Sequence, residues 1–317
     1  MKHNLTAEPT HSVWDRTLTP RLHIAPGDSA SIQCVDASGA QVHPGMSLAD
    51  YLAIDRTRIH ALTGPIYIDS AEPGDVLQID ILEIRHHGWG WTSIVEGLGF
   101  LKDHFRDPYL FHWTLDAVTT ASLAPAIVPV RPFPGVIGVA RADSGAFRTR
   151  PPGPFGGNLD VRELCAGSTL YLPIFVPGAL FSIGDGHAAQ GDGEVCINGI
   201  ESPLDLTLRF QLHKQQPLSG PIVESADSIA PDSDPDSHSE WIVLETGSDL
   251  ASTAQAATLR MIDLLVTRWG FTPIHAYILC SVAMRLRLSQ VVNEPIHTVS
   301  AAMSKQILPP RVLFPTS

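Results

Sequence analysis

The stretch VLQIDILEI, residues 76–84, indicates the fold class of this chain. Its apolar and polar residues alternate, so Leu77, Ile79 and Ile81 lie on one face of an extended strand and the polar residues between them lie on the other. A Pro-Gly-Asp turn sequence at residues 73–75 comes directly before it. We therefore predict a half-buried β-strand that begins at this turn.

Short runs of the same character recur through the first two thirds of the chain. They are rich in Val, Ile, Leu and Thr and are bounded by Gly, Pro or Asp, at residues 21–24, 31–35, 66–68 and 206–212. Only 17% of the 317 residues are charged, while 26 Pro and 25 Gly indicate short elements joined by tight turns. The expected fold is α+β and mainly β, with a β-sandwich or barrel-like core of short strands in residues 1–222.

The last third of the chain has a different character. Residues 223–240 collect Ser, Asp and Pro with few apolar side chains, which predicts an exposed, mobile loop. Apolar residues then follow a helical stripe over residues 250–269, and a Thr-Pro pair at 272–273 is typical of a second helix start. We expect that second helix to run to about Leu288. The sequence thus predicts a helical hairpin within residues 241–317 that packs on the β-rich part as one unit.

Charge and cysteine usage exclude several classes of protein. The chain has 33 Asp and Glu against 21 Lys and Arg, a formal net charge of -12 at pH 7, which is the wrong sign for a nucleic-acid partner. Its four cysteines form no CxxC pair, so we expect reduced thiols. The most apolar run, residues 170–181, contains two prolines and is shorter than the roughly 20 residues that span a bilayer. We expect a cytoplasmic protein without a membrane partner.

The densest group of possible catalytic side chains is GDGHAAQGDGE, residues 184–194. Asp185 and His187 are two residues apart, so they lie on the same face if the chain leading to them is extended. The glycines at positions 191 and 193 can then turn the chain back, which returns Glu194 to the same end. This pattern predicts an imidazole and two carboxylates close together.

A second polar pair, Asn158 and Asp160, has the same spacing and follows a Gly-Gly step. If the two pairs face one another, one imidazole with several oxygen atoms suits zinc or another divalent ion. A bound water would then ionise near neutral pH, which is the chemistry of a hydrolase. The alternative interpretation is a tight, glycine-rich hairpin whose acids face solvent.

Other catalytic and binding patterns are absent. The sequence contains no GxSxG, Walker A or HExxH motif, and the spacing from Asp185 to Glu194 is shorter than the roughly 12-residue EF-hand loop. His60 precedes a Gly-Pro turn and is either a further ligand or a hydrogen-bonded loop histidine.

Four motifs, in this order, resemble the acetamidase/formamidase family. They are GGNLD at 156–160, GSTLYLP at 167–173, VPGAL at 176–180 and GDGHAAQGDGEVC at 184–196. LTGPIY at 62–67 and AEPGDVL at 71–77 agree with the family as well, and the resemblance extends over residues 8–310.

The resemblance implies a metal-dependent amidohydrolase of mainly β architecture that acts on formamide, acetamide or another short amide and releases ammonia. Its central motifs coincide with the polar residues singled out above. The site residues that it implies are Asn158, Asp160, Asp185, His187, Asp192 and Glu194, with Gln190 and His60 as secondary candidates. The motifs leave open which of these bind metal and which move protons.

Our hypothesis for the reaction places a divalent ion at three of these residues, with zinc expected and calcium or another divalent ion as the alternatives. The expected metal ligands are His187, Asp185 and Asp160. Glu194 would take a proton from water and deliver it to the leaving nitrogen, while Asn158 or a backbone N–H would stabilise the oxyanion. Asp192 is a further catalytic candidate.

Two other functions stay open: a protein that binds a small amide or a metal without turnover, and an amidase for a larger or cyclic amide. Two departures from the family bear on the second. Met284 and Arg285 stand where a small residue and an acid are expected, on the predicted second helix, and the segment 225–240 looks longer than the family requires. By analogy with the family, we also expect a homo-oligomer.

Overall fold

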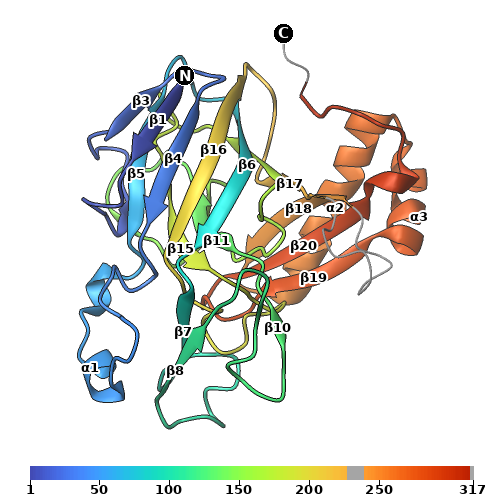
Figure 1. Cartoon of the computed structure of the whole chain (residues 1–317). Coiled ribbons are helices and arrows are strands. Elements are labelled where there is room, and N and C mark those ends of the chain that lie inside the picture. Colours follow the sequence, from blue (N-terminus) through green and yellow to red (C-terminus); the bar gives the residue numbers. More distant parts are fainter. Residues whose placement is uncertain (227–238, 315–317) are drawn as a thin grey trace.

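Two β-sheets that pack face to face form the body of the molecule, and two helices lie against one end of the larger sheet (Figure 1). The computed structural model describes residues 1–226 and 239–314. Within these ranges the sheets stay open, so the core is a sandwich and not a closed barrel. The expectation of an α+β, mainly β fold with a C-terminal helical pair is confirmed.

The larger sheet has nine strands and is antiparallel except where β1 runs parallel to β4. In spatial order its strands are β1 (Lys2–Leu5), β4 (Ser29–Cys34), β16 (Leu204–His213), β6 (Val76–His86), β14 (Thr169–Pro173), β17 (Ile222–Glu224), β18 (Glu240–Gly247), β20 (His297–Ser304) and β19 (Arg285–Gln290).

The smaller sheet has five strands and is antiparallel except for the parallel pair β3 and β5. In spatial order its strands are β13 (Gly156–Asn158), β11 (Phe133–Gly138), β15 (Phe181–His187), β5 (Leu62–Ile68) and β3 (Leu22–Ile24). One apolar core joins the two sheets, with Ile79 and Ile81 of β6 and Phe181 and Ile183 of β15 all fully buried in it. Burial of this apolar surface is what stabilises the sandwich.

Three short two-stranded pairings and several small helical elements complete the fold. The pairs are β7 (Trp89–Ile94) with β8 (Tyr109–Thr114), β9 (Thr119–Thr120) with β10 (Val128–Pro129), and β2 (Val13–Trp14) with β12 (Phe147–Arg148). The small helical elements are α1 (Leu48–Leu52) and the 3-10 turns Arg56–Arg58 and Lys305–Ile307. In the described parts of the chain, no helix has the length and apolar character needed to cross a membrane.

The strand predicted at residues 76–84 is confirmed as β6, which starts at the same residue and continues to His86. Leu77, Ile79 and Ile81 have no exposed surface, whereas Leu82 on the other face is 46% exposed. The four other predicted runs coincide with β3, β4, β5 and β16. In the runs at β3 and β4, one predicted residue lies just outside the strand. Alternation and turn residues were sufficient to locate these strands because each has one face on the shared core.

The first predicted helix is confirmed as α2 (Leu250–Trp269). Asp249 caps its first turn by accepting from the N–H of Ser252, and Gly270 ends it in the left-handed conformation at φ 74°. Its buried stripe, which includes Met261 and Leu265, packs on β18 and β20.

The second predicted helix begins as expected but ends early. α3 (Pro273–Ala283) starts at the Thr272 cap and does not extend to Leu288, because residues 285–290 pair with β20 as strand β19. Met284 is therefore the cap residue after the helix and Arg285 the first residue of a strand, where it forms an ion pair with Glu240. Residues 241–317 thus contain three strands as well as the helical pair, which corrects the expectation of a hairpin alone.

Both ends of the Ser/Asp/Pro-rich segment predicted as a loop belong to strands. Val223 and Glu224 belong to β17, and Glu240 begins β18, where its side chain is buried. The remainder of the prediction, at residues 227–238, lies outside the described residues.

Strand β11 brings the two glycine-flanked segments together. Val136 pairs with Asn158 of β13 on one side and with Gly184 of β15 on the other, so the chain after both neighbours reaches the same end of the sheet. Gly135 makes this convergence possible, since a Cβ there would lie 2.8 Å from Oδ1 of Asp160 and 2.9 Å from Oδ2 of Asp185. Asp160 lies just beyond Asn158 and Asp185 just beyond Gly184, so both acids lie at this end of the sheet.

Candidate active site

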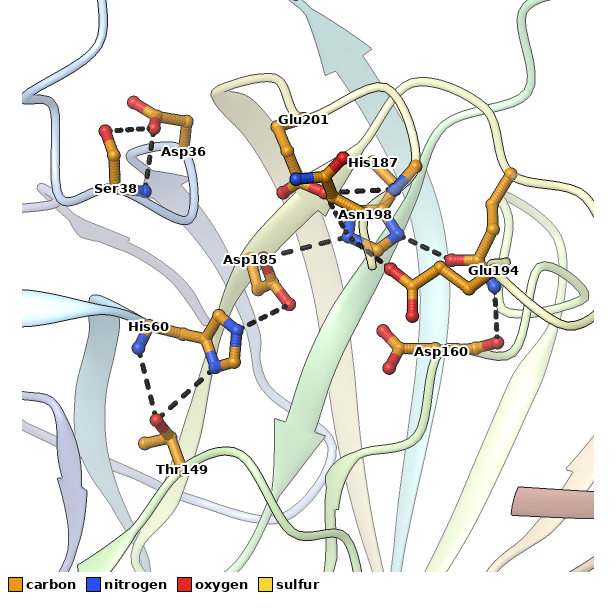
Figure 2. Close-up of polar contacts among 12 residues, drawn as sticks. Asp36, Ser38, His60, Thr149, Asp160, Asp185, His187, Glu194, Asn198 and Glu201 are labelled. Atoms are coloured by element: carbon orange, nitrogen blue, oxygen red, sulfur yellow. Dashed lines mark hydrogen bonds and ion pairs between the residues drawn. The ribbon is translucent and has the colours of Figure 1, made fainter. Parts of the chain in front are cut away.

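Five buried ionisable side chains converge at the end of β15 (Figure 2). The residues of this buried cluster are Asp160, Asp185, His187, Glu194 and Glu201. They form two groups of three that share His187, one with Asp160 and Asp185 and the other with Glu194 and Glu201, and in each group the potential ligand atoms lie within 4.8 Å of one another. This is the arrangement of one imidazole among carboxylates that the sequence predicted.

The imidazole of His187 has a defined orientation. Its Nδ1 lies 2.8 Å from Oε1 of Gln190, whose Nε2 donates to the carbonyls of Asp160 and Ser289. Because the amide nitrogen is committed to those carbonyls, its oxygen must accept, so Nδ1 carries a proton. Burial lowers the pKa of this imidazole, but the neighbouring carboxylates of Glu201 and Asp185 outweigh burial and raise it. Nε2 points into the cluster, 3.1 Å from Glu201, 3.7 Å from Asp185 and 4.0 Å from Glu194.

The backbone at three of the acids adopts a conformation that is uncommon outside glycine. Asp160, Asp185 and Glu194 have φ angles of 52°, 54° and 50°. Left-handed backbone at non-glycine residues costs free energy and persists where surrounding structure imposes it, often at functional sites. The fold therefore stabilises these three carboxylates in their positions against a local preference.

Burial and mutual repulsion perturb the acids of the cluster. Burial raises the pKa of Asp160 to about 7 and the pKa of Glu201 to about 8, although His187 acts in the opposite direction on both. Burial and the charge of Asp160 also raise the pKa of Glu194. Burial acts likewise on Asp185, but the neighbouring His60 and His187 outweigh it and lower its pKa. The cluster cannot hold four carboxylate charges beside one imidazole without further positive charge or protons.

Unpartnered oxygen atoms indicate where positive charge would fit. Four buried oxygens of the site have no hydrogen-bond partner: Oδ1 of Asn158, Oδ1 of Asp160, Oε2 of Glu194 and Oε2 of Glu201. Leaving a buried acceptor unsatisfied costs about 1–3 kcal/mol, and more when it is charged. A divalent cation held by carboxylates and the free Nε2 of His187 would satisfy such atoms, and this donor set suits zinc. The residues present therefore fit a metal ion.

Two side chains support the carboxylates from outside the cluster. Nδ2 of Asn293 donates to Oδ2 of Asp160 at 2.6 Å, and His60 lies 3.9 Å from Oδ2 of Asp185. His60 is itself positioned by Thr149, whose hydroxyl contacts both its backbone N–H and its Nδ1 (Figure 2). Partners of this kind fix the orientation of metal-binding or proton-carrying groups.

Most of the side chains singled out from the sequence meet in this site. Asn158, Asp185, His187 and Glu194 are buried around one cavity, Asp160 is buried beside Asp185 and His187, and Gln190 and His60 contact members of the cluster. The alternative of a tight hairpin with solvent-facing acids is thus wrong for Asp185 and Glu194. The individual roles assigned to these residues stay predictions.

Asp192 is the exception, and its assignment to the catalytic centre needs correction. Its side chain is 40% exposed and forms an ion pair with Arg162, with 3.0 Å between Oδ1 and Nε. The chain turns between Gly191 and Ile197, so that Glu194 points inward while Asp192 remains at the surface. The spacing of the motif did not distinguish these two acids.

Two residues of the site were not identified from the sequence. Glu201 enters the cluster because residues 188–200 form an excursion that closes with a bridge between His187 and Glu201. The sequence signal for Glu201 was its place as an acid at the end of this glycine-rich excursion. Asn293 gave none, since its contact with Asp160 depends on how distant segments pack.

A cavity of about 610 Å³ opens above the cluster. Asn158, Asp185, His187, Glu194 and Glu201 line its buried end, and the side chains of Tyr51 and Trp91 contribute apolar surface. A reactant in this cavity would meet carboxylates with raised pKa values and an amide side chain, which is a setting for proton transfer during hydrolysis.

Comparison with known proteins identifies the same family that the motifs resemble. The family model for the acetamidase/formamidase family matches residues 1–144 and 140–309. A formamidase of Methylophilus methylotrophus is 28% identical, and the matched region covers 60% of this chain and 60% of that protein. The chain thus spans less than two thirds of the length of this curated relative.

Two solved structures resemble the whole described fold. One is a predicted acetamidase/formamidase of the thermophile Thermoanaerobacter tengcongensis, with a TM-score of 0.87, 27% identity and 97% of both chains covered. The other is an acetamidase of Bacillus halodurans, with a TM-score of 0.86, 30% identity, and coverage of 96% of this chain and 98% of that one.

Proposed function

We propose that this chain, which belongs to the acetamidase/formamidase family, hydrolyses a primary amide to a carboxylate and ammonia. The observation that supports this most directly is the buried cluster around His187, which has four unpartnered oxygen atoms and lies at the end of a cavity. The names of the relatives point to formamide and acetamide as simple substrates of this kind.

The proposal includes a divalent metal ion, with zinc as the first choice and calcium or another divalent ion as the alternatives. His187, Asp160 and Asp185 would hold it, in agreement with the hydrogen bond that engages Nδ1 of His187 and leaves Nε2 pointing into the cluster. When bound, such an ion supplies polarisation of the amide carbonyl and lowers the pKa of water. The test is elemental analysis of purified protein beside the same measurement on the His187→Ala variant.

Glu194 is the proposed general base and acid. It lines the cavity with one unpartnered oxygen, and burial together with the charge of Asp160 raises its pKa, which makes the carboxylate a stronger proton acceptor. Glu194 would take a proton from the attacking water and deliver it to the nitrogen as the C–N bond breaks. The carboxylate and ammonia are then the products.

Asn158 is the proposed donor to the oxyanion. Its side chain is buried at the same end of the cavity, where the amide N–H groups can face a carbonyl oxygen that becomes negative. A single well-placed donor of this type contributes about 3–4 kcal/mol, whereas ordinary enzymatic acceleration needs at least about 8 kcal/mol. Asn158 would therefore act together with the proton transfer by Glu194.

The competing function is a protein that binds a small amide or a metal without turnover. An ammonia-release assay across formamide, acetamide, propionamide and larger amides, with and without a chelator, separates the two. Ammonia release that a chelator abolishes and added zinc restores supports the metal-dependent amidase. Amide binding without ammonia release would favour the binding protein, and turnover that resists the chelator would contradict metal dependence.

We also propose that the chain forms a homo-oligomer. The support is an apolar stripe on the outer face of α3, where Ile274, Tyr277, Ile278 and Val282 are all more than half exposed. Multi-angle light scattering of the purified protein gives the mass in solution, and a monomer at micromolar concentration would contradict this. The cytoplasmic location expected from the sequence stays a prediction.

A further inference from the structure

The cavity is much larger than formamide or acetamide requires. Acetamide has four non-hydrogen atoms, which need roughly 100 Å³ if each takes about the volume of one water molecule. The cavity measures about 610 Å³, within the range that binds ligands of many atoms. Most of its volume therefore lies beyond the amide group that the buried cluster would hold.

Ionisable residues are distributed unevenly along the cavity. Its carboxylates, those of Asp185, Glu194 and Glu201, are all buried at the cluster. Three arginines line the same cavity, with Arg56 and Arg148 exposed to solvent and Arg150 half-buried. We call Arg56, Arg148 and Arg150 the basic rim.

Contacts between neighbouring segments place the basic rim on one side of the cavity. Arg148 pairs with Val13 in the β12–β2 ladder, and the adjacent Ser12 hydroxyl donates to the carbonyl of Thr57, next to Arg56. Arg150 follows two residues after Arg148 and lies with Nη2 3.5 Å from the carbonyl of Val292. Two segments that are distant in sequence, one with Arg56 and one with Arg148 and Arg150, thus bring their arginines to the same side of the cavity.

The basic rim has no carboxylate partner of its own. In residues 1–226 and 239–314 no Asp or Glu oxygen lies within 4.0 Å of these three guanidinium groups, although arginines elsewhere, such as Arg209 and Arg260, form such ion pairs. Burial lowers the pKa of Arg150, and the nearby positive charge of Arg148 lowers it further. The negative charges of Glu294 and Glu194 act in the opposite direction and raise it. Repulsion between the two arginines would be relieved by an anion between them.

Apolar surface also borders this cavity. It comes from Tyr51, Ile59, Trp91, Val95, Leu98 and Ile197. A methylene chain or another apolar group of a ligand would be desolvated against these side chains, with a gain of about 0.8 kcal/mol for each buried CH₂. The cavity therefore offers a site for an amide, apolar surface and a site for an anion.

We propose that the preferred substrate is a primary amide whose acyl chain ends in a carboxylate, that is, a monoamide of a dicarboxylic acid. Its amide would bind at the buried cluster and its carboxylate at Arg148 and Arg150. Water attacks the amide carbon, the C–N bond breaks, and the products are the dicarboxylate and ammonia, so the far carboxylate is unchanged. This inference rests on the proposed amidase function and adds its substrate class.

Matched substrate pairs test the inference. We would measure kcat/KM of the zinc-loaded protein for succinamate against butanamide and for adipamate against hexanamide, since each pair has the same acyl length and differs by the carboxylate. We expect at least one carboxylate-bearing amide to exceed its neutral partner by about 10-fold or more, in line with charge-assisted hydrogen bonds. This preference should weaken as ionic strength rises, because Arg148 is exposed.

Variants of the basic rim test the residues. Arg148→Gln and Arg150→Gln should each lower kcat/KM for the favoured carboxylate-bearing amide by about 10- to 100-fold, mainly through KM. Arg148→Gln should leave the neutral partner within about threefold, and Arg150→Gln, whose charge also acts on Glu194, should lower the neutral partner by less than the carboxylate-bearing amide. Arg85→Gln is the matched control, because Arg85 is an exposed arginine paired with Glu83 and does not line this cavity. Calorimetric titration with adipate should show weaker binding to both rim variants than to the Arg85→Gln protein.

Three results would overturn the inference. Equal or better hydrolysis of both neutral amides would refute the substrate class while leaving the amidase function in place. Loss of activity toward both members of a pair in the rim variants would mean that the arginines only balance the charge of the cluster. If no amide releases ammonia from the zinc-loaded protein, the proposed function itself fails, and this inference fails with it.

Discussion

The side chain of Gln190 fixes the imidazole of His187, with 2.8 Å between Oε1 and Nδ1. Gln190 can do this because its Nε2 donates at 3.0 Å to the carbonyl of Asp160 and at 3.2 Å to that of Ser289. The same amide thus connects the excursion after β15, the chain after β13 and the edge strand β19. A residue that the motif suggested only as a secondary candidate orients the central imidazole of the site.

We predict that Gln190→Ala lowers zinc affinity by about 10- to 100-fold without abolishing folding. Loss of the amide leaves Nδ1 of His187 without its acceptor, so the ring no longer presents Nε2 in one orientation. Competition with a chromophoric chelator measures the affinity, and the midpoint of thermal unfolding checks the fold. Unchanged affinity in a folded Gln190→Ala protein would mean that other contacts orient the imidazole.

Removal of the proposed metal ion should destabilise the protein. Without a cation, the carboxylates of Asp160, Glu194 and Glu201 lie buried near one another, and an ion that binds only the native state adds RT ln(1 + [L]/Kd) to stability. We expect a strong chelator to lower the midpoint of thermal unfolding and zinc to restore it. At an ion concentration of 100 times Kd, the free energy of unfolding should rise by about 2.7 kcal/mol.

The His187→Ala variant is the control for this measurement. Because both three-residue groups share His187, the variant should bind less than one ion per chain at concentrations that saturate the native sequence. Its unfolding midpoint should then no longer respond to the chelator. A response as large as that of the native protein would place the ion elsewhere.

Asp75 gives a pH-dependent contribution to stability that is independent of the site. Its buried carboxylate lies 2.6 Å from Nζ of Lys214 and accepts from the backbone N–H groups of Glu72 and Gln215. Burial alone would raise its pKa, but Lys214 and these N–H groups together lower it below the ordinary value of 3.8. Since the pKa is lower in the folded state, the contribution is complete above pH 3.8 and is lost as pH falls through the folded value.

The Asp75→Asn variant tests this assignment. At neutral pH the variant should unfold at a lower temperature than the native protein, because the ion pair with Lys214 and the charge-assisted hydrogen bonds are weakened. Below pH 3.8 the two midpoints should approach one another. A difference that stays constant from neutral pH into this acid range would show that Asp75 does not titrate in the folded protein as described.

Local sequence patterns predicted those parts of the fold that local interactions determine. The strand β6 followed from alternation of its residues, and α2 followed from the helical spacing of its apolar residues over 250–269. The strand β19 was taken for helix because its identity depends on pairing with β20 across intervening residues. Arg285 and Arg287 alternate with two leucines, but four residues directly after a helix give too little periodicity to mark a strand.

For the site as well, the sequence predicted only those features that local spacing determines. Asp185 and His187 share a face because they are two residues apart on one strand, which the sequence states directly. Asn293 and Glu201 reach the cluster through packing between distant segments, and no local pattern specifies that. Asp192 was misplaced because the direction of a side chain in an irregular turn depends on individual backbone angles, such as the φ of 50° at Glu194.

The contrast between Glu194 and Asp192 provides the sharpest test of the proposed proton transfer. We predict that Glu194→Gln lowers kcat for acetamide by about 10²- to 10⁴-fold, the usual range for loss of a general acid or base. The isosteric amide keeps the shape of the buried side chain but cannot accept and return a proton. Asp192→Asn should leave kcat within about threefold, since Asp192 forms only an exposed ion pair with Arg162, which contributes little.

Metal content must be measured on both variants, because Glu194 also belongs to one of the groups that could hold an ion. If Glu194→Gln retains the ion and loses turnover, proton transfer is its role. If it loses the ion and turnover together, Glu194 is a metal ligand and another buried acid is the base. Glu201 is then the first candidate, because burial and the charge of Asp185 raise its pKa to about 8. If Glu194→Gln retains near-native activity, Glu194 is not the base. If Asp192→Asn is the inactive variant, the proposed placement of the reacting groups is wrong, because an exposed carboxylate 3.0 Å from Arg162 would then have to reach the substrate.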